Sequence, residues 1–240
     1  MTLLALTLAA PGLKIDWTGL TLYNTIISLS AGAGLLLVVA LGRQLLASGR
    51  TVTPDGWALA FGAIGLVLLI TGLHMSLAWP LVGGGFPQNN IIFGEPAVIF
   101  GVVLLAASLY LWKRGAGINA SDRIVHTVRV TAPISVLVFG VGLACLGIAA
   151  AGWKYTIFAA PAEEPIAGLF AEWPVVETSF VSGAYLLVGI GAILFPFALR
   201  RPSGRTVQVV GVAWGLAGLA YFLFGALAYF THIGLIMNTK

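Results

Sequence analysis

The chain has very few charged residues. Asp, Glu, Lys and Arg together make up 8% of its 240 residues, whereas hydrophobic residues make up 59%, and the mean hydropathy is +1.02. A water-soluble domain carries about 25% charged residues to cover its surface. This shortage excludes a soluble globular protein, and we expect most of the outer surface to contact lipid.

Cysteine is almost absent, and so are the motifs of common enzyme classes. The single cysteine, Cys145, cannot form a disulfide within the chain, and its apolar neighbours are typical of a small packing residue. The sequence contains no phosphate-binding loop, nucleophile elbow, HExxH or CxxC motif. The sequence alone therefore leaves open whether the protein is an enzyme.

Long apolar runs account for most of the chain. Crossing a bilayer takes about 20 apolar residues, and six runs are of this kind: 20–46, 57–79, 92–112, 131–151, 179–199 and 207–233. The sequence predicts an all-α integral membrane bundle of six transmembrane helices, forming one domain over 1–240. We also expect residues 1–13 to lie in the membrane interface, and a short interfacial helix, 166–173, in the long loop 152–178.

The charges are divided unevenly between the two sides that six crossings create. Nine Lys and Arg residues follow the first, third and fifth runs, and only Lys14, Lys154 and Lys240 fall on the other side. Short loops rich in Lys and Arg mark the cytoplasm, so both termini are predicted to lie outside. Six of the eight acidic residues share that outer side. The net charge of +4 therefore reflects orientation in a membrane rather than binding of nucleic acid.

Four ionisable side chains are predicted at a similar depth near the outer face. They are His74, late in the second span; Glu95, which opens the third; Glu177, which opens the fifth; and His232, late in the sixth. Ionisable groups near the hydrocarbon are costly and are therefore functional candidates. Imidazole and carboxylate suit borderline divalent ions, so these residues are candidate ligands for zinc, copper, iron or manganese.

Each of these residues also has a structural interpretation. A histidine at the end of a span is often only a polar group at the headgroup level, and Glu95 is placed to stabilise a helix N-terminus. If the site exists, Asn24 and Asn90 are candidate donors that orient the ligands. Met75 directly follows His74 and is expected to face away from any site that His74 joins.

The segment 71–96 resembles the signature of a known family. It reads Thr71-Gly-Leu-His-Met-Ser-Leu-Ala-Trp-Pro-Leu81 and then Asn90-Ile-Ile-Phe-Gly-Glu-Pro96. This is similar to an uncharacterised family of bacterial and archaeal membrane proteins, domain of unknown function 981. The resemblance implies a polytopic fold in the plasma membrane of a prokaryote and supplies no activity. It also implies that His74, Trp79, Asn90 and Glu95 belong to one unit on the outer side.

Two functions fit these features better than a third. The first is an outer-face His/Glu site that binds a metal ion or a proton-linked small ligand. The second is an accessory subunit of a larger membrane complex, such as a respiratory or oxidase-type complex, which packs through Gly and Ala faces. One such face carries Gly211, Gly218 and Gly225 at sevenfold spacing, with Gly215 beside them. A small transporter is less favoured, because the inner halves of the spans are nearly devoid of ionisable residues.

A weak internal similarity relates two spans. The segment 95–105 aligns with 177–187, and the alignment places Gly101 over Gly183. Both segments start a span at the same face, so the helix pairs two–three and four–five are candidate parallel repeats. Apolar helices resemble one another easily, and the alternative is that the similarity carries no structural meaning.

Overall fold

Every regular element in the computed structural model is helical over the residues that it describes, which are 13–20 and 23–240. Six helices are long and apolar enough to cross a membrane, with mean hydropathies of 1.8 to 2.1 in their most apolar windows. The predicted all-α bundle of six spans is confirmed. The interfacial segment predicted for residues 1–13 lies, except for Leu13, outside the described residues.

The long helices begin and end close to the predicted limits. Their bounds are α1 Asn24–Leu46, α2 Pro54–Ala78, α4 Glu95–Arg114, α6 Ser135–Tyr155, α7 Pro174–Arg200 and α8 Arg205–Asn238. Shorter elements connect them: η1 Trp17–Gly19, α3 Pro87–Asn89, the π-helical η2 Asn90–Gly94, η3 Gly115–Asn119, α5 Arg123–Thr131 and η4 Ala167–Phe170. Proline stands in the first turn of α2, α4 and α7, where its missing N–H is not needed.

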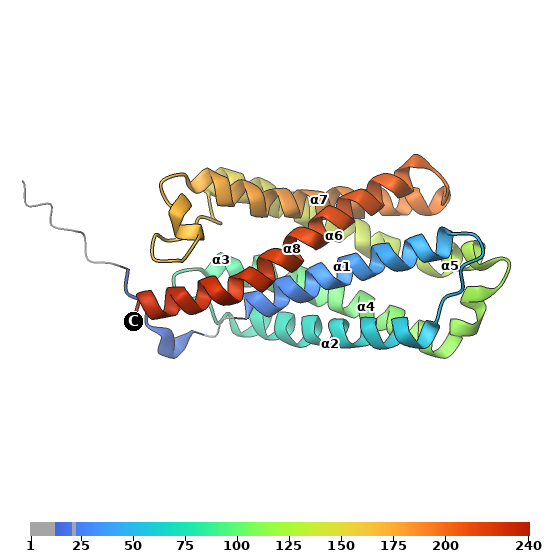
Figure 1. Ribbon diagram of the computed structural model, residues 1–240, viewed down its shortest axis with the longest axis horizontal. Coiled ribbons are helices and arrows are strands. Elements are labelled where there is room, and N and C mark those ends of the chain that lie inside the picture. The colour runs from blue at the N-terminus through green and yellow to red at the C-terminus, as the bar shows by residue number, and fades with distance from the viewer. Residues whose placement is uncertain (1–12, 21–22) are drawn as a thin grey trace, which may run out of the picture.

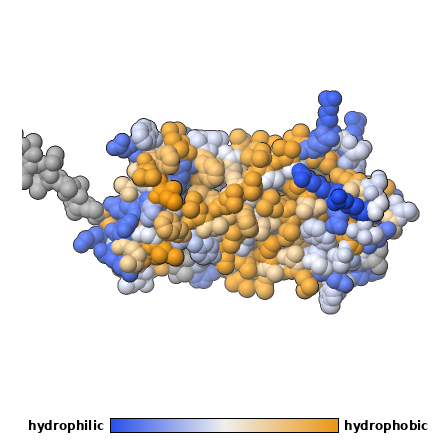
Figure 2. Space-filling model, viewed as in Figure 1, coloured by the Kyte–Doolittle hydropathy of each residue, from blue (hydrophilic) through white to orange (hydrophobic). Residues whose placement is uncertain are grey.

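The beginning and the end of the described chain lie together at one end of the bundle, which we call the termini end (Figure 1). There the Ile15 N–H donates to the Thr239 carbonyl at 3.2 Å, and the Trp17 indole donates to the Thr239 hydroxyl at 3.0 Å. The opposite end, which we call the loop end, carries the connections 47–53, 115–134 and 201–204. Figure 2 shows hydrophilic residues at both ends and a hydrophobic zone between them, as a membrane protein requires.

Two of the three closest helix pairs are hairpins with glycine at the contact. In the α2–α4 hairpin, a Cβ added at Gly101 would lie 2.7 Å from the Leu69 nitrogen. In the α6–α7 hairpin, a Cβ added at Gly189 would lie 3.0 Å from the Gly142 carbonyl oxygen. Small residues are favoured at such contacts because they let two backbones approach closely within lipid.

The third pair, α1 and α8, crosses between the two hairpins (Figure 1). A Cβ added at Gly32 would lie 2.7 Å from the Gly218 carbonyl oxygen, and one added at Gly225 would lie 2.5 Å from a backbone nitrogen of α1. Two glycines of the sevenfold face of α8, Gly218 and Gly225, therefore pack against α1 of the same chain. At Gly211 and Gly215 an added Cβ would meet no described atom within 4 Å beyond its own helical turn.

The glycines that the internal alignment equates occupy different environments. Gly101 packs tightly against α2, whereas a Cβ at Gly183 would meet no atom of the described chain within 4 Å outside its own turn. On α7 the close contact is made by Gly189 instead. The two hairpins are therefore alike in overall form, but their glycine contacts do not follow the aligned register.

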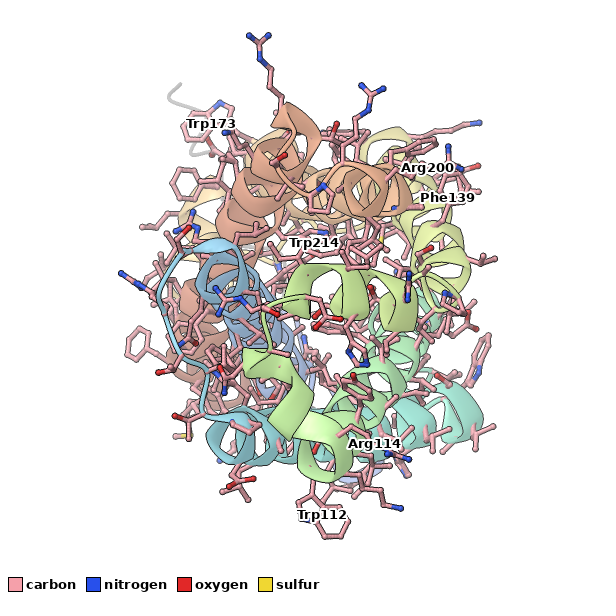
Figure 3. The ribbon with its side chains drawn as sticks, turned by 90° about the vertical axis from the view of Figure 1, so that its right-hand side faces the viewer. Trp112, Arg114, Phe139, Trp173, Arg200 and Trp214 are labelled. Atoms are coloured by element: carbon pink, nitrogen blue, oxygen red, sulfur yellow. The ribbon has the colours of Figure 1, made fainter. Side chains whose placement is uncertain are left out.

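The tryptophans of the spans serve two purposes. Figure 3, which looks onto the loop end, shows Trp112 pointing away from the bundle and Trp214 lying within it. Trp112 is 67% exposed, as expected for the aromatic belt at a membrane interface. Trp214 is 8% exposed, and its indole N–H donates to the Val188 carbonyl at 3.2 Å.

Candidate functional site

The predicted site residues fall into two groups. Glu177, His232 and Asn24 line one cavity at the termini end, whereas His74 and Glu95 are exposed and lie outside its lining. Across residues 13–20 and 23–240, no three or more His, Cys, Asp or Glu side chains are grouped so that they could hold a metal ion. The structure therefore does not gather the four candidate ligands around one point.

His74 lies near the end of α2 and contacts the start of α1. Its Nδ1 is hydrogen-bonded to the Tyr23 hydroxyl, and the two rings meet edge to face with centroids 5.6 Å apart. Met75, expected to face away from any site that His74 joins, is fully buried in the core, whereas His74 is exposed on another side of α2.

Asn90 holds the turn between α2 and α4. Its side chain is fully buried: Oδ1 accepts from the Leu81 N–H at 3.2 Å, and Nδ2 donates to the Pro87 carbonyl at 3.1 Å. Both polar atoms are engaged by the backbone, and Asn90 does not line the cavity. Its neighbour Asn89 does line it.

Much of the 71–96 motif is explained by a tight corner at the termini end. A Cβ added at Gly72 would lie 2.9 Å from the Gly94 carbonyl oxygen, so these glycines let α2 and η2 touch. Trp79 ends α2 in a left-handed conformation (φ 49°), and its indole donates to the Ser76 carbonyl at 2.9 Å. Glu95 is the first residue of α4 and is exposed there, where a carboxylate stabilises the positive end of the helix dipole.

The cavity at the termini end has a volume of about 150 Å³. Its walls come from the start of α1, the 81–93 turn, the loop 157–164, the start of α7 and the second half of α8. All three helix pairs or their connecting turns therefore contribute. Most of the lining is apolar and aromatic, with a small number of polar side chains, which is the usual composition of a ligand pocket.

Several polar atoms around the cavity lack a hydrogen bond. Within the described chain, Asn24 Oδ1, Asn89 Oδ1, the Tyr221 hydroxyl and His232 Nδ1 are buried and make no hydrogen bond of good geometry. The Tyr221 hydroxyl has only the side chain of Tyr185 as a nearby partner. An unpaired buried polar atom costs about 1–3 kcal/mol, so native proteins seldom keep one without a reason. Four such atoms around one cavity are available to bond to water or to a ligand.

Glu177 connects the cavity to the loop that covers it, residues 156–173, which we call the roof loop. Glu177 Oε2 accepts a hydrogen bond from the Ala160 N–H at 2.7 Å. Farther along the roof loop, Glu163 Oε1 accepts from the Leu13 N–H at 2.7 Å, and the Glu163 carbonyl accepts from Asn238 Nδ2 at 2.8 Å. Both ends of the described chain therefore hold the roof loop in place.

The helix predicted for 166–173 is a single 3-10 turn, η4. It is preceded by Ile166 at φ 67° and ψ −63°, and the Ala167 N–H donates to the Pro165 carbonyl at 2.8 Å. This is a tight γ-turn that a β-branched residue adopts only with strain. The turn reverses the chain just before η4, which ends at Phe170.

A family model described as a protein of unknown function, DUF981, matches residues 20–234. The chain belongs to the DUF981 family. No curated protein and no solved structure matches it. The resemblance seen in the 71–96 motif of this DUF981 protein is thus confirmed, and the match extends through all six spans.

Three lining residues of the DUF981 cavity were missed by sequence reasoning. Asn89 stands next to Asn90, and no pattern tells which of two adjacent amides points inward. Tyr221 lies in the middle of the last span and offered only a lone hydroxyl as a signal. Glu164 sits in a polar loop, and nothing in the sequence indicates that it faces inward, yet the roof loop brings it into the lining.

Proposed function

We propose that this DUF981 protein binds a small ligand in the cavity at the termini end, with Glu177 and His232 among the residues that contact it. The supporting observation is that Asn24, Asn89, Tyr221 and His232 all line the cavity and carry buried polar atoms without a hydrogen bond of good geometry in the described structure. A carboxyl and an imidazole beside one ligand can exchange a proton with it, so binding would be proton-linked.

A blocked cavity tests this proposal. Ala228 lines the cavity and is 4% exposed, so Ala228→Phe would fill the space. We expect one-ring compounds to raise the melting temperature of the purified wild type and to leave that of Ala228→Phe unchanged. Gly211→Ala, on the same helix and facing open space, is the control and should respond like the wild type. Equal shifts in all three proteins would end the proposal.

A metal ion is the second ligand that we propose for this site. Within the cavity lining, Glu177 and His232 are the pair of imidazole and carboxylate donors that the sequence analysis selected. An ion held there would fill its remaining positions with water or a ligand. Metal analysis of the purified protein tests this proposal.

The cavity is proposed to open to the outside of a prokaryotic plasma membrane. Nine Lys and Arg residues gather at the loop end, against three at the termini end, and short basic loops remain in the cytoplasm. Alkaline phosphatase fused after Lys240 should be active, and green fluorescent protein at the same place should be dark. The opposite pair of results would mean that the cavity opens to the cytoplasm.

A role as an accessory subunit is the alternative proposal. Gly211 and Gly215 form an open GxxxG pair on α8, whereas Gly218 and Gly225 already contact α1. A partner helix would therefore meet α8 near the loop end. Co-purification of a stoichiometric subunit from the native membrane, lost in Gly215→Leu, would support this role, and a single monodisperse species from that membrane would count against it.

A further inference from the structure

We infer that the ligand of this cavity is a small organic ammonium ion, with an apolar body about the size of one aromatic ring. This inference rests on the proposed function and narrows it to a class of ligand. Its basis is the combination of three features of the lining: the sign of its charges, the kind of hydrogen-bonding atoms it leaves free, and its aromatic surface.

The charged groups of the lining favour a cation. Glu164 and Glu177 both line the cavity, and the described lining includes no Lys or Arg. The three lysines on this side of the bundle, Lys14, Lys154 and Lys240, lie outside the lining. A ligand carboxylate or phosphate would therefore meet like charge without compensation, whereas an ammonium group would be attracted.

The free hydrogen-bonding atoms fit a donor. Asn24 Oδ1 and Asn89 Oδ1 are acceptors without partners, and the Ala160 N–H engages only Oε2 of Glu177, which leaves Oε1 for a ligand. An ammonium group offers up to three N–H donors and no acceptor. It can therefore donate to a carboxylate or amide oxygen of this lining, which a ligand that carries only acceptors cannot do.

Aromatic rings supply the remaining surface. Phe180 of α7 and Phe224 of α8 lie with ring centroids 5.5 Å apart, and Phe93 and Phe158 form a second pair at 6.5 Å. Ring faces attract a desolvated cation and also pack against its apolar body. A volume of about 150 Å³ is that of a cavity that holds benzene, so the ligand body is limited to about one ring.

Three probes of similar size and different charge test the inference: benzylammonium, benzyl alcohol and benzoate. Binding is measured by ligand-observed NMR titration of the protein in detergent, with the blocked variant Ala228→Phe as the background for partition into micelles. We expect benzylammonium to bind about tenfold more tightly than benzyl alcohol, a difference of about 1.4 kcal/mol, since a charge-assisted hydrogen bond is stronger than one between neutral groups. Benzoate should not bind.

Glu177→Gln is the matched variant, because glutamine retains an oxygen that can accept from Ala160 and so keeps the roof loop in place. It should abolish the preference for benzylammonium over benzyl alcohol. Glu164→Gln tests the second carboxylate in the same way and should reduce the preference. Equal binding of benzyl alcohol and benzylammonium, or an unchanged preference in both variants, would overturn the ammonium assignment while ligand binding stands. No specific binding of any probe would overturn the ammonium assignment and the proposed function together.

Discussion

The two ends of the bundle differ in how completely their buried polar side chains are hydrogen-bonded. At the loop end they are paired: Asn119 exchanges two hydrogen bonds with the Val52 backbone, and Arg123 donates to the carbonyls of Ala47 and Arg50. Among the described residues, the buried polar side-chain atoms without a hydrogen bond of good geometry lie toward the termini end or, for Tyr221, at the middle of α8; they belong to Asn24, Asn89, Thr178, Ser182, Tyr221 and His232. Paired groups contribute to stability, and unpaired groups are retained at the expense of stability where function needs them.

The hollows at the two ends show the same contrast. The loop-end hollow is larger, about 410 Å³, and is lined by residues 46–51 and 119–124. The polar side chains Asn119 and Arg123 in its wall are already bound to backbone groups. The smaller cavity at the termini end has free polar atoms. Buried polar atoms without a hydrogen bond, rather than size, therefore distinguish the candidate site.

The largest expected effect on stability comes from the contact between α1 and α8, which run from one end of the bundle to the other. Gly32→Ala would push a Cβ into the backbone of α8 near Gly218, and such overpacking costs about 3 kcal/mol or more where backbone blocks the way. We expect thermal unfolding in detergent to show a greatly destabilised protein. Gly215→Ala, which meets open space, should change stability by less than about 0.5 kcal/mol. Equal stability of the two variants would contradict the crossing of α1 and α8.

The stability costs of replacing one asparagine at each end, Asn119 and Asn24, compare the two ends directly. Asn119→Ala removes both hydrogen bonds of Val52, which is 2% exposed, and leaving its backbone unpaired should cost about 2 kcal/mol. Asn24→Ala should cost less than about 0.5 kcal/mol, because its Oδ1 has no partner to lose within the described structure. Denaturant titration measures both. A larger loss for Asn24→Ala than for Asn119→Ala would reverse the comparison.

A smaller effect is expected at Arg123. Its guanidinium reaches two carbonyls, each at 2.6 Å, and so closes the turn between α1 and α2. Lysine cannot present the same planar pair of donors, so Arg123→Lys should lower the unfolding free energy by about 1 kcal/mol. Arg129→Lys, at an exposed position of α5, is the control and should be neutral. Melting curves of the two variants at matched detergent concentration measure this difference, and equal melting temperatures would contradict the role of Arg123.

Metal content gives the smallest expected change. If an ion occupies the cavity, His232→Ala should lower the bound metal, whereas His74→Ala should leave it unchanged, because His74 lies outside the lining and pairs with Tyr23. Elemental analysis of the purified proteins measures this difference. Loss of metal on His74→Ala would restore the arrangement predicted from the sequence, and a metal-free wild type would remove the metal proposal.

The architecture was largely predictable, because the bilayer fixes the length and the composition of each span. The sequence also indicated that Glu177, His232 and Asn24 lie at a similar depth, and these residues line the same cavity. The sequence did not predict the direction in which a side chain points around its helix. A helix that is apolar on all sides has no polar face to mark its outside, so Met75 and His74, one residue apart, gave no sign of which faced the core.

The pairing of the first and last spans has a consequence for biosynthesis. About 190 residues separate the end of α1 from the end of α8, and a ribosome adds about 5–20 residues per second. The α1 helix must therefore wait in the bilayer for roughly ten to forty seconds before its partner is inserted. During that interval Ser28, whose hydroxyl later donates to the Tyr221 carbonyl, faces lipid or a chaperone. Nascent chains stalled before α8 should for this reason be recognised by membrane quality control.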